Sequence, residues 1–389
     1  MENRQTYNIP RLRFPEFVGR TNWVQTTLGS EMDYENGVAH EKNINLVGKY
    51  VVVNSKFIST EGKIEKRTDI PLNLAEENDI VMVLSDLPKG KALGKCFFVD
   101  KSGKYTVNQR ICRLRSKGVN SKLLFYIINR NPYFLSFDDG VKQTNLKKEE
   151  VLNCPLFIPE SVKEQERIAD CLSSIDIYIS FISEKVEQLK AHKISLVQKM
   201  FPANGMSIPE FRFPEFRGTK EWDMKVFGDC LDYEQPQPYL VVSDDYKSAG
   251  VPVLTAGKTF VLGYTDEKQG VYEQLPVIIF DDFTTASRYV KFPFKAKSSA
   301  MKMLQAKKGY DLKFMFELIQ NYNFEPKEHQ RHWISIFSKF KTLVPTYQEQ
   351  KKVAMFLATI DNMIELFSEK KNQLEQYKKG LLQQLFPTK

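Results

Sequence analysis

The chain has 389 residues, of which 42% are hydrophobic and 27% are charged, and its formal net charge is +8. This length allows two or three domains with cores of their own, and the composition excludes disordered and collagen-like proteins. No stretch reaches the roughly 18 to 20 apolar residues that span a bilayer, and the N-terminus lacks the apolar core of a signal peptide, so we expect a cytoplasmic protein without a membrane partner.

The chain begins with a segment that recurs later. Residues 9–35 match residues 208–234 without a gap, at a constant offset of 199 positions, and the shared residues include Phe14, Trp23 and Tyr34. Self-similarity of this kind predicts two copies of one structural module.

A globular head follows each opening segment. Short runs rich in β-branched and aromatic residues, bounded by Gly, Pro, Asn or Asp, predict strands. These runs are residues 49–54, 79–85, 95–100 and 110–115 in the first head and residues 258–264 and 275–282 in the second. Residues 123–130 and 312–320 predict one helix in each head, so both heads should be of the α+β class.

A heptad pattern closes each unit. Residues 158–202 match residues 344–387 after a one-residue deletion, and both segments carry a Glu-Gln pair and an Ile-Asp pair at the same places. Apolar residues follow alternating steps of four and three, which predicts a seam of the coiled-coil type. The expected seam residues are Ile168, Leu172, Ile175, Ile179, Ile182 and Leu189 in the first helix and Val353, Leu357, Ile360, Ile364, Phe367 and Leu374 in the second.

Two arrangements could bury these seams. Each helix could pack on its own head, but two copies of one seam in one chain favour pairing of the helices with each other. The short linker at residues 203–205 then requires antiparallel helices. Lys193, Lys371 and Lys378 interrupt the seam and would favour one register at some cost in stability. About 40 helical residues would form a rod of roughly 60 Å.

We therefore expect an α+β fold built as a pseudo-twofold tandem repeat, in which two globular domains are separated and joined by two long antiparallel coiled-coil helices. The expected boundaries are residues 1–157 and 206–343 for the domains and residues 158–205 and 344–389 for the helices. The net charge lies mainly in the first domain, which has 24 basic and 18 acidic residues.

Basic residues gather at equivalent places in the two heads. Residues 87–115 contain eight Lys and Arg against the single acid Asp100, and residues 283–310 contain seven Lys and Arg and no acid. A single charge run is usually a solvated surface, but recurrence in both heads favours contacts with DNA phosphates, with bidentate side chains nearby to recognise bases. The candidate DNA-binding residues are Lys56, Ser59, Lys66, Arg67, Lys89, Lys91, Lys95, Asn108, Gln109, Arg110, Lys142, Gln143 and Asn145 in the first head, and Lys258, Thr284, Thr285, Arg288, Lys291, Lys295, Lys302, His329, Gln330 and Arg331 in the second.

Catalytic motifs are incomplete. The segment from Gly90 to Cys96 has too few residues between its glycines for a phosphate-binding loop and no Ser or Thr after its lysine. The segment Asn131-Pro-Tyr-Phe lacks the second proline of the adenine-methyltransferase motif. The pair Asp281-Asp282 lacks the other residues of a nuclease magnesium site. We therefore expect a non-catalytic chain.

Metal ligands are also sparse. The five cysteines are widely spaced with no CxxC pair, which is typical of reduced structural thiols. Only His329 and His332 lie close together, and no cysteine or acid stands at ligand spacing. The sequence predicts no metal site and no cofactor on this chain.

The two-unit layout, the Phe-Pro-Glu-Phe openings, the elements near Gly94 and Asn108, and the helices with Glu-Gln and Ile-Asp pairs resemble specificity subunits of type I restriction–modification systems over essentially the whole chain. The resemblance implies that the heads are target-recognition domains, each binding one half of a bipartite site in double-stranded DNA, and that the helices set the unread gap. It also implies two modification subunits, which methylate adenine with S-adenosylmethionine, and two restriction subunits, which use ATP and Mg²⁺ for translocation and cleavage.

Two alternatives stay open at this point. One is a stand-alone two-headed DNA-binding or scaffold protein, which would not copurify with a methyltransferase. The other is a self-contained methyltransferase or nuclease, which the incomplete motifs disfavour.

Overall fold

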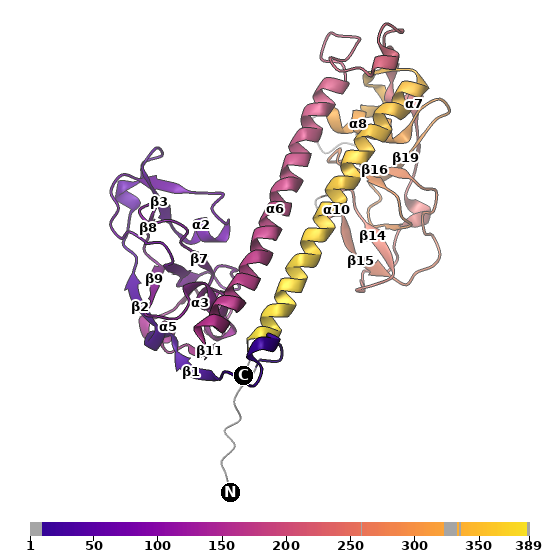
Figure 1. Ribbon diagram of the computed structural model, residues 1–389. Coiled ribbons are helices and arrows are strands. Elements are labelled where there is room, and N and C mark those ends of the chain that lie inside the picture. The colour runs from indigo at the N-terminus through magenta and orange to yellow at the C-terminus, as the bar shows by residue number, and fades with distance from the viewer. Residues whose placement is uncertain (1–9, 258, 323–332, 334–335, 387–389) are drawn as a thin grey trace. The chain divides into compact units, whose positions relative to one another are not determined.

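The computed structural model describes residues 10–257, 259–322, 333 and 336–386. Contacts divide the chain into two compact units. Unit 1 contains the chain up to Phe181 and from Lys370 onward, and unit 2 contains Ile182–Glu369. Two long helices, α6 (Val162–Met200) and α10 (Tyr347–Leu385), continue from one unit into the other (Figure 1). Each unit therefore combines one globular head with half of each long helix, whereas the predicted boundaries assigned whole helices to segments of their own.

The head of unit 1 is built around β5 (Ile80–Val83), whose four residues are all buried. Ile80 and Met82 belong to one hydrophobic core, and Val81 and Val83 belong to another. Successive side chains of a strand point to opposite faces, so β5 is covered on both faces. This double burial explains the uninterrupted apolar run that predicted a strand here.

The other strands of this head are β1 (Trp23–Thr27), β2 (Met32–Asn36), β3 (Tyr50–Val53), β4 (Lys66–Thr68), β6 (Ser85–Asp86), β7 (Cys96–Phe98), β8 (Tyr105–Val107), β9 (Ile111–Ser116), β10 (Thr144–Asn145) and β11 (Pro155–Pro159). One sheet has the order β2–β9–β5–β7 and is antiparallel, and another has the order β4–β3–β8, with β3 and β8 parallel. The pairs β1–β11 and β6–β10 complete the head. Its helices are α1 (Leu28–Glu31), α2 (Ser55–Ser59), α3 (Ser121–Ile128), α4 (Pro132–Leu135) and α5 (Lys148–Leu152).

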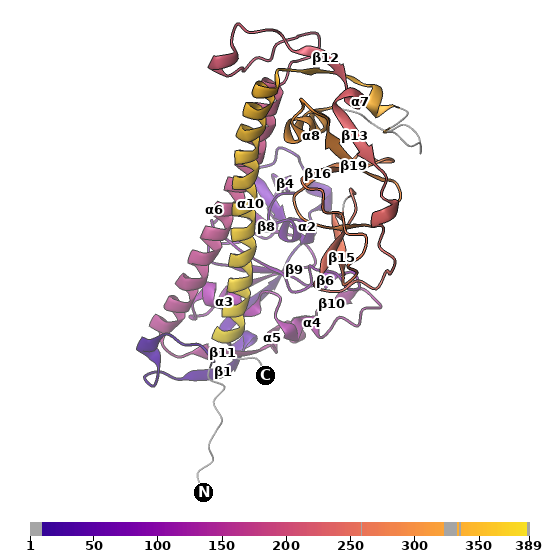
Figure 2. The ribbon, with the colours of Figure 1, turned by 90° about the vertical axis from the view of Figure 1, so that its right-hand side faces the viewer.

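The head of unit 2 repeats this plan around β16 (Val277–Asp281). Its other elements are β12 (Asp223–Val226), α7 (Phe227–Cys230), β13 (Leu231–Glu234), β14 (Val251–Leu254), β15 (Val261–Thr265), β17 (Ser287–Val290), β18 (Lys295–Ala296), β19 (Met301–Ala306), α8 (Leu312–Asn321) and β20 (Lys341–Val344). The order β13–β19–β16–β17 corresponds to β2–β9–β5–β7, and the order β15–β14–β18 corresponds to β4–β3–β8. Figure 2 shows α8 beside β16 and β19. The predicted α+β class and tandem repeat are confirmed.

Within each unit the two long helices pack against each other and against the head. In unit 1, Leu172 of α6 shares a core with Leu385 of α10 and Trp23 of the head. In unit 2, Met200 of α6 shares a core with Leu357 of α10 and with residues of α8. All twelve predicted seam residues are buried or partly buried, and the helices run antiparallel (Figure 1). The predicted pairing is confirmed, and the head also covers part of the seam. None of the helices in the described ranges is both long and apolar enough to cross a membrane.

Candidate nucleic-acid interface

A buried carboxylate fixes each head to the start of its closing helix. In unit 1, Arg13 Nε donates to Glu164 Oε1 (2.6 Å), and Trp23 Nε1 donates to the same oxygen (3.2 Å). In unit 2, Arg212 Nε donates to Glu349 Oε1 (2.8 Å), and Trp222 Nε1 donates to it as well (3.2 Å). We call these two sites the carboxylate clamps. The two arginines were not among the predicted functional residues, although both occupy equivalent positions in the 199-residue repeat.

The glutamine next to each clamp binds the residue that caps the helix of the head. Gln165 Oε1 accepts a hydrogen bond from the backbone of Asn120 just before α3, and Gln350 Oε1 accepts one from Asp311 just before α8 (both 2.9 Å). The repeated Glu-Gln pair therefore positions two parts of the head relative to the long helix.

The repeated Ile-Asp pair has a different partner, the opposite long helix. Asp176 of α6 forms an ion pair with Lys378 of α10 in unit 1, and Asp361 of α10 forms one with Lys193 of α6 in unit 2 (2.8 Å). The residue numbers of each pair add up to the same value, so both pairs specify one antiparallel register. Two of the three predicted register lysines thus make the cross-helix contacts. We call these the cross-helix pairs.

Several candidate DNA contacts of the first head come together where β5 ends. The backbone N–H of Val83 donates to the carbonyl of Lys95 (3.0 Å). The backbone N–H of Leu84 donates to the carbonyl of Arg110 (2.9 Å). In the short sheet that follows, Ser85 pairs with Asn145. Lys95 Nζ also lies 3.4 Å from the carbonyl oxygen of a residue in α2. Segments far apart in sequence therefore meet at this strand end.

Two loops at this strand end are held by aspartates. The carboxylate of Asp86 accepts hydrogen bonds from three backbone N–H groups of its own loop, at 2.6 to 3.1 Å. Asp138 accepts one from the backbone of Lys89 in the first loop (3.2 Å), which joins the two loops. Backbone N–H groups of Lys142 and its neighbour bind Asp139 and lower the pKa of that carboxyl. Because the aspartates are occupied with backbone groups, the lysine side chains of these loops extend into solvent.

The exposed lysines of these loops are Lys89, Lys91 and Lys142, and none has a side-chain partner among the described residues. Gly90 lies between Lys89 and Lys91. A Cβ at this position would lie 2.1 Å from the Asp86 carboxylate, so glycine is the residue that fits there. These three lysines are therefore open to a ligand.

Asn108 and Gln109 are occupied within the head. Both side chains donate to Glu41 Oε1, at 3.2 and 3.0 Å, and Asn108 Oδ1 accepts from the backbone of His40. A backbone N–H and the Asn108 amide are the main causes that lower the pKa of Glu41. These contacts disfavour the predicted base-recognition role for both amides.

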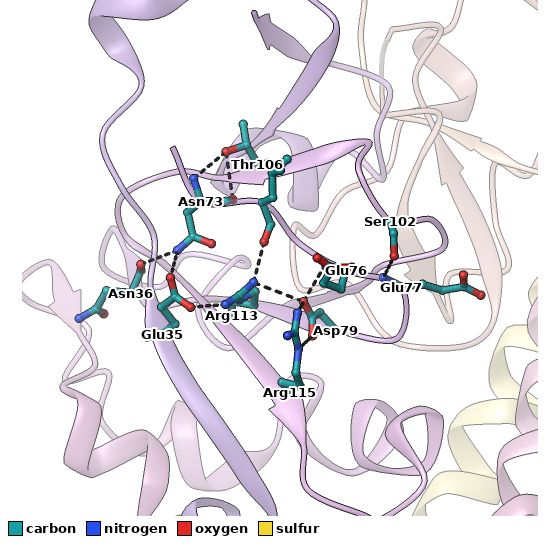
Figure 3. Close-up of polar contacts among 11 residues, drawn as sticks. Glu35, Asn36, Asn73, Glu76, Glu77, Asp79, Ser102, Thr106, Arg113 and Arg115 are labelled. Carbon is teal, nitrogen blue, oxygen red and sulfur yellow. Dashed lines mark hydrogen bonds and ion pairs between the residues drawn. The ribbon is translucent and has the colours of Figure 1, made fainter. Parts of the chain in front are cut away.

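The basic run through β9 is likewise partly neutralised. Arg113 forms an ion pair with Glu35, and Arg115 Nε donates to Asp79 Oδ1 (2.7 Å). Figure 3 shows both arginines within one polar network that also contains Asn73, whose Nδ2 donates to Glu35 (2.9 Å). This half of the run therefore stabilises the surface of the sheet.

The remaining candidate DNA contacts of the first head also fall into two groups, exposed side chains without a partner and side chains that are bound within the head. Lys56 on α2 and Lys66 on β4 are exposed and have no side-chain partner among the described residues. Ser59 donates to the carbonyl of Lys56 (3.1 Å), and Arg67 forms an ion pair with Glu65 (2.8 Å).

In the second head, the turn after β16 uses the same aspartate-held arrangement. Asp281 Oδ1 accepts hydrogen bonds from the backbone and hydroxyl of Thr284, at 2.8 and 3.0 Å. Thr285 has a φ of 58°, and the carboxylate of Asp282 accepts from the backbone of Trp333 (2.9 Å). The acidic pair is thus part of a structural turn.

Arg288 and Lys291 face the long helices. The Arg288 guanidinium lies 5.7 Å from the ring centre of Phe260, and Lys291 Nζ lies 3.4 Å from Asn362 Oδ1 of α10. Both line a cavity of about 610 Å³ within unit 2, between β17, α8 and the two helices.

Lys295 and Lys302 were predicted as DNA contacts, but the structure places both side chains inside the head. Lys295 is 3% exposed and donates to Glu267 (2.6 Å). Lys302 is fully buried and pairs with Asp282 (3.1 Å). Both side chains belong to the interior and cannot reach a phosphate.

Lys258, His329, Gln330 and Arg331 lie outside the described residues. Within the described part of the chain, no group of three or more His, Cys, Asp or Glu side chains is arranged to hold a metal ion. The five cysteines form no disulfide, and four of them are buried.

Residues 21–191 match the family described as type I restriction modification DNA specificity domain. The specificity subunit of the type I restriction enzyme EcoR124I/EcoR124II from Escherichia coli is 43% identical over 148 residues, so the match spans 36% of this chain and 37% of that relative. The MjaVIII specificity subunit from Methanocaldococcus jannaschii is 24% identical over an alignment that covers 97% of this chain and 94% of that protein.

A solved structure shows the same fold. The S subunit of a type I restriction–modification system from M. genitalium has a TM-score of 0.71 at 17% identity, and the match covers 98% of this chain and all of that one. A domain described as a type I restriction modification DNA specificity domain thus covers residues 21–191, and the chain is similar to type I specificity subunits along nearly its whole length.

Proposed function

We propose that this chain recognises DNA for a type I restriction–modification complex, with each head binding one half of a bipartite site. The observation that carries the proposal is the repeated strand end. In the first head Asp86 of β6, which directly follows β5, holds the next loop through backbone N–H groups, and in the second head Asp281 at the end of β16 holds the turn that follows it. The exposed side chains at these places differ between the heads, as expected if the two heads bind different half-site sequences.

The helices suit the docking of partner subunits. Tyr178 and Phe181 on α6 and Met363 and Leu366 on α10 are 39% to 62% exposed, and they occupy equivalent positions in the two repeats. Exposed apolar residues at matching positions are typical of interaction sites. We place one modification subunit on each pair, which gives two copies of one partner in the complex.

The division of labour follows from this arrangement. Modification subunits with S-adenosylmethionine would methylate adenine, and two restriction subunits with ATP and Mg²⁺ would translocate and cleave DNA. The present chain would supply recognition and geometry without catalysis, acting on DNA in the cytoplasm.

Methylome sequencing tests the proposal. A host carrying the chain and its modification subunit should methylate one motif made of two short sequences with a fixed gap, and deletion of this chain should abolish that methylation. Failure of the chain to copurify with a methyltransferase, together with an unchanged methylome, would instead support a stand-alone DNA-binding or scaffold protein.

A further inference from the structure

Two exposed amides stand side by side at the strand end of the first head. Gln143 Nε2 donates to the hydroxyl of Ser85 (2.7 Å) and to Asn145 Oδ1 (3.3 Å). Ser85 pairs with Asn145 in the β6–β10 ladder, so all three side chains lie on one face of this short sheet.

The internal bonds leave one donor and one acceptor free. Asn145 Nδ2 and Gln143 Oε1 have no partner among the described residues, and both residues are exposed. Rotating both amides by half a turn would exchange the roles of the two residues, because a hydroxyl both donates and accepts. The pair would still present one donor beside one acceptor.

Basic residues flank this amide pair. Lys89 and Arg110 both adopt left-handed backbone conformations, with φ of 57° and 67°, which is uncommon for residues with a side chain. Both positions therefore carry a long basic side chain where glycine would adopt the backbone conformation without strain. Neither side chain has a partner among the described residues.

The pattern of donor and acceptor selects one base. In the major groove, adenine presents the N7 acceptor beside the N6 amino donor, whereas guanine presents two acceptors and cytosine presents a donor. Thymine presents one acceptor and a methyl group. An adjacent amide donor and acceptor are therefore complementary to adenine.

We propose that Gln143 and Asn145 together recognise the adenine of one A·T pair in the half-site of the first head, while Lys89 and Arg110 bind the flanking phosphates. This inference rests on the proposed function and names the residues that perform it. The amides supply specificity, and the two cations supply affinity that is independent of sequence.

The test uses the full chain expressed with its modification subunit, and compares the wild type with Gln143→Ala, Asn145→Ala and the control Gln25→Ala. Gln25 is an exposed amide on β1 of the same head. The methylomes should show that both amide variants lose about tenfold or more of the preference for A·T at one position of one half-site. The other half-site and the gap should not change, and Gln25→Ala should match the wild type.

Lys89→Ala separates the two roles. It should weaken binding to matched and mismatched sites equally and reduce the slope of log affinity against log salt by about one. Thermal unfolding at the wild-type temperature would confirm that each variant is folded.

The possible results distinguish failure of the adenine assignment from failure of the proposed function. A wild-type methylome with a bipartite motif, combined with unchanged specificity in Asn145→Ala or relaxation at a G·C pair, would overturn the adenine assignment alone. A wild-type methylome without any motif that depends on this chain would overturn the proposed function itself.

Discussion

Glu164 shows how one residue can fix the position of a whole domain. Its carboxylate is fully buried and accepts hydrogen bonds from Arg13, Thr21 and Trp23, which lie on the segment that opens the head. Burial alone would raise the pKa of this carboxyl, but the hydrogen bonds of the clamp outweigh it, and the pKa is lowered.

We expect Glu164→Gln to lower the free energy of unfolding by about 3 kcal/mol, because the Arg13 guanidinium, 10% exposed, loses its counter-charge. Urea unfolding measures this difference. Glu166→Gln, at an exposed position on the same helix, is the matched control and should leave stability unchanged. Equal stability of the two variants would show that the clamp does not stabilise the fold.

The clamp should also depend on pH. A carboxyl whose pKa is lowered in the folded state contributes stability above its unfolded pKa, about 4.3 for glutamate, and loses it as the pH falls through the folded value. The difference in Tm between the wild type and Glu164→Gln should therefore be full at pH 7 and should shrink below about pH 4. A difference that is constant over this range would contradict the ionic account.

At the scale of elements, the cross-helix pairs set the register of the two long helices. Each pair replaces one apolar contact in the seam with an ion pair, and both specify the same alignment. Polar residues at seam positions commonly select one register at some cost in stability.

A charge exchange in unit 1 tests this role. Asp176→Lys should destabilise the protein because it brings a second cation beside Lys378, and the double variant Asp176→Lys with Lys378→Asp should recover part of the loss. A double-mutant cycle in urea should give a coupling of about 1 to 3 kcal/mol. Additive effects of the two substitutions would show that the pair does not couple the helices.

The sequence predicted the elements better than the site. Heptads, alternating apolar runs and the repeat itself are local patterns, and the strands, the two head helices and the seam followed from them. Whether a lysine is buried depends on contacts with residues that are distant in sequence. Lys302 lies on a strand whose counterpart position in the first head is the buried Cys112, and only the strand pairing reveals this equivalence. Likewise, the meeting of Lys95, Arg110 and Asn145 depends on contacts among distant segments.

At the scale of the whole molecule, we propose that the paired helices determine the gap between half-sites. The boundary between the units falls after Phe181 in α6 and after Glu369 in α10, so one heptad inserted at both points keeps each cross-helix pair within its own unit. Seven residues lengthen a helix by about 10 Å, which corresponds to roughly three base pairs.

The methylome of this matched insertion should show the same two half-sites with a longer gap. Insertion into α6 alone should instead reduce stability, because one helix is then out of register with the other. Changed half-site sequences with an unchanged gap would refute the idea that the helices act as a ruler.

The contact between the opening segment of the first head and α10 also bears on how the protein folds. The backbone N–H of Leu12 donates to the carbonyl of Gln384 (3.0 Å), and Leu385 completes the core beneath Trp23. The core of the first head is therefore complete only after Leu385 of α10 has been synthesised. A truncated chain would expose the apolar seam of α6, which is the kind of surface that chaperones and proteases recognise. Chains that end before α10 should thus be degraded faster than the full chain.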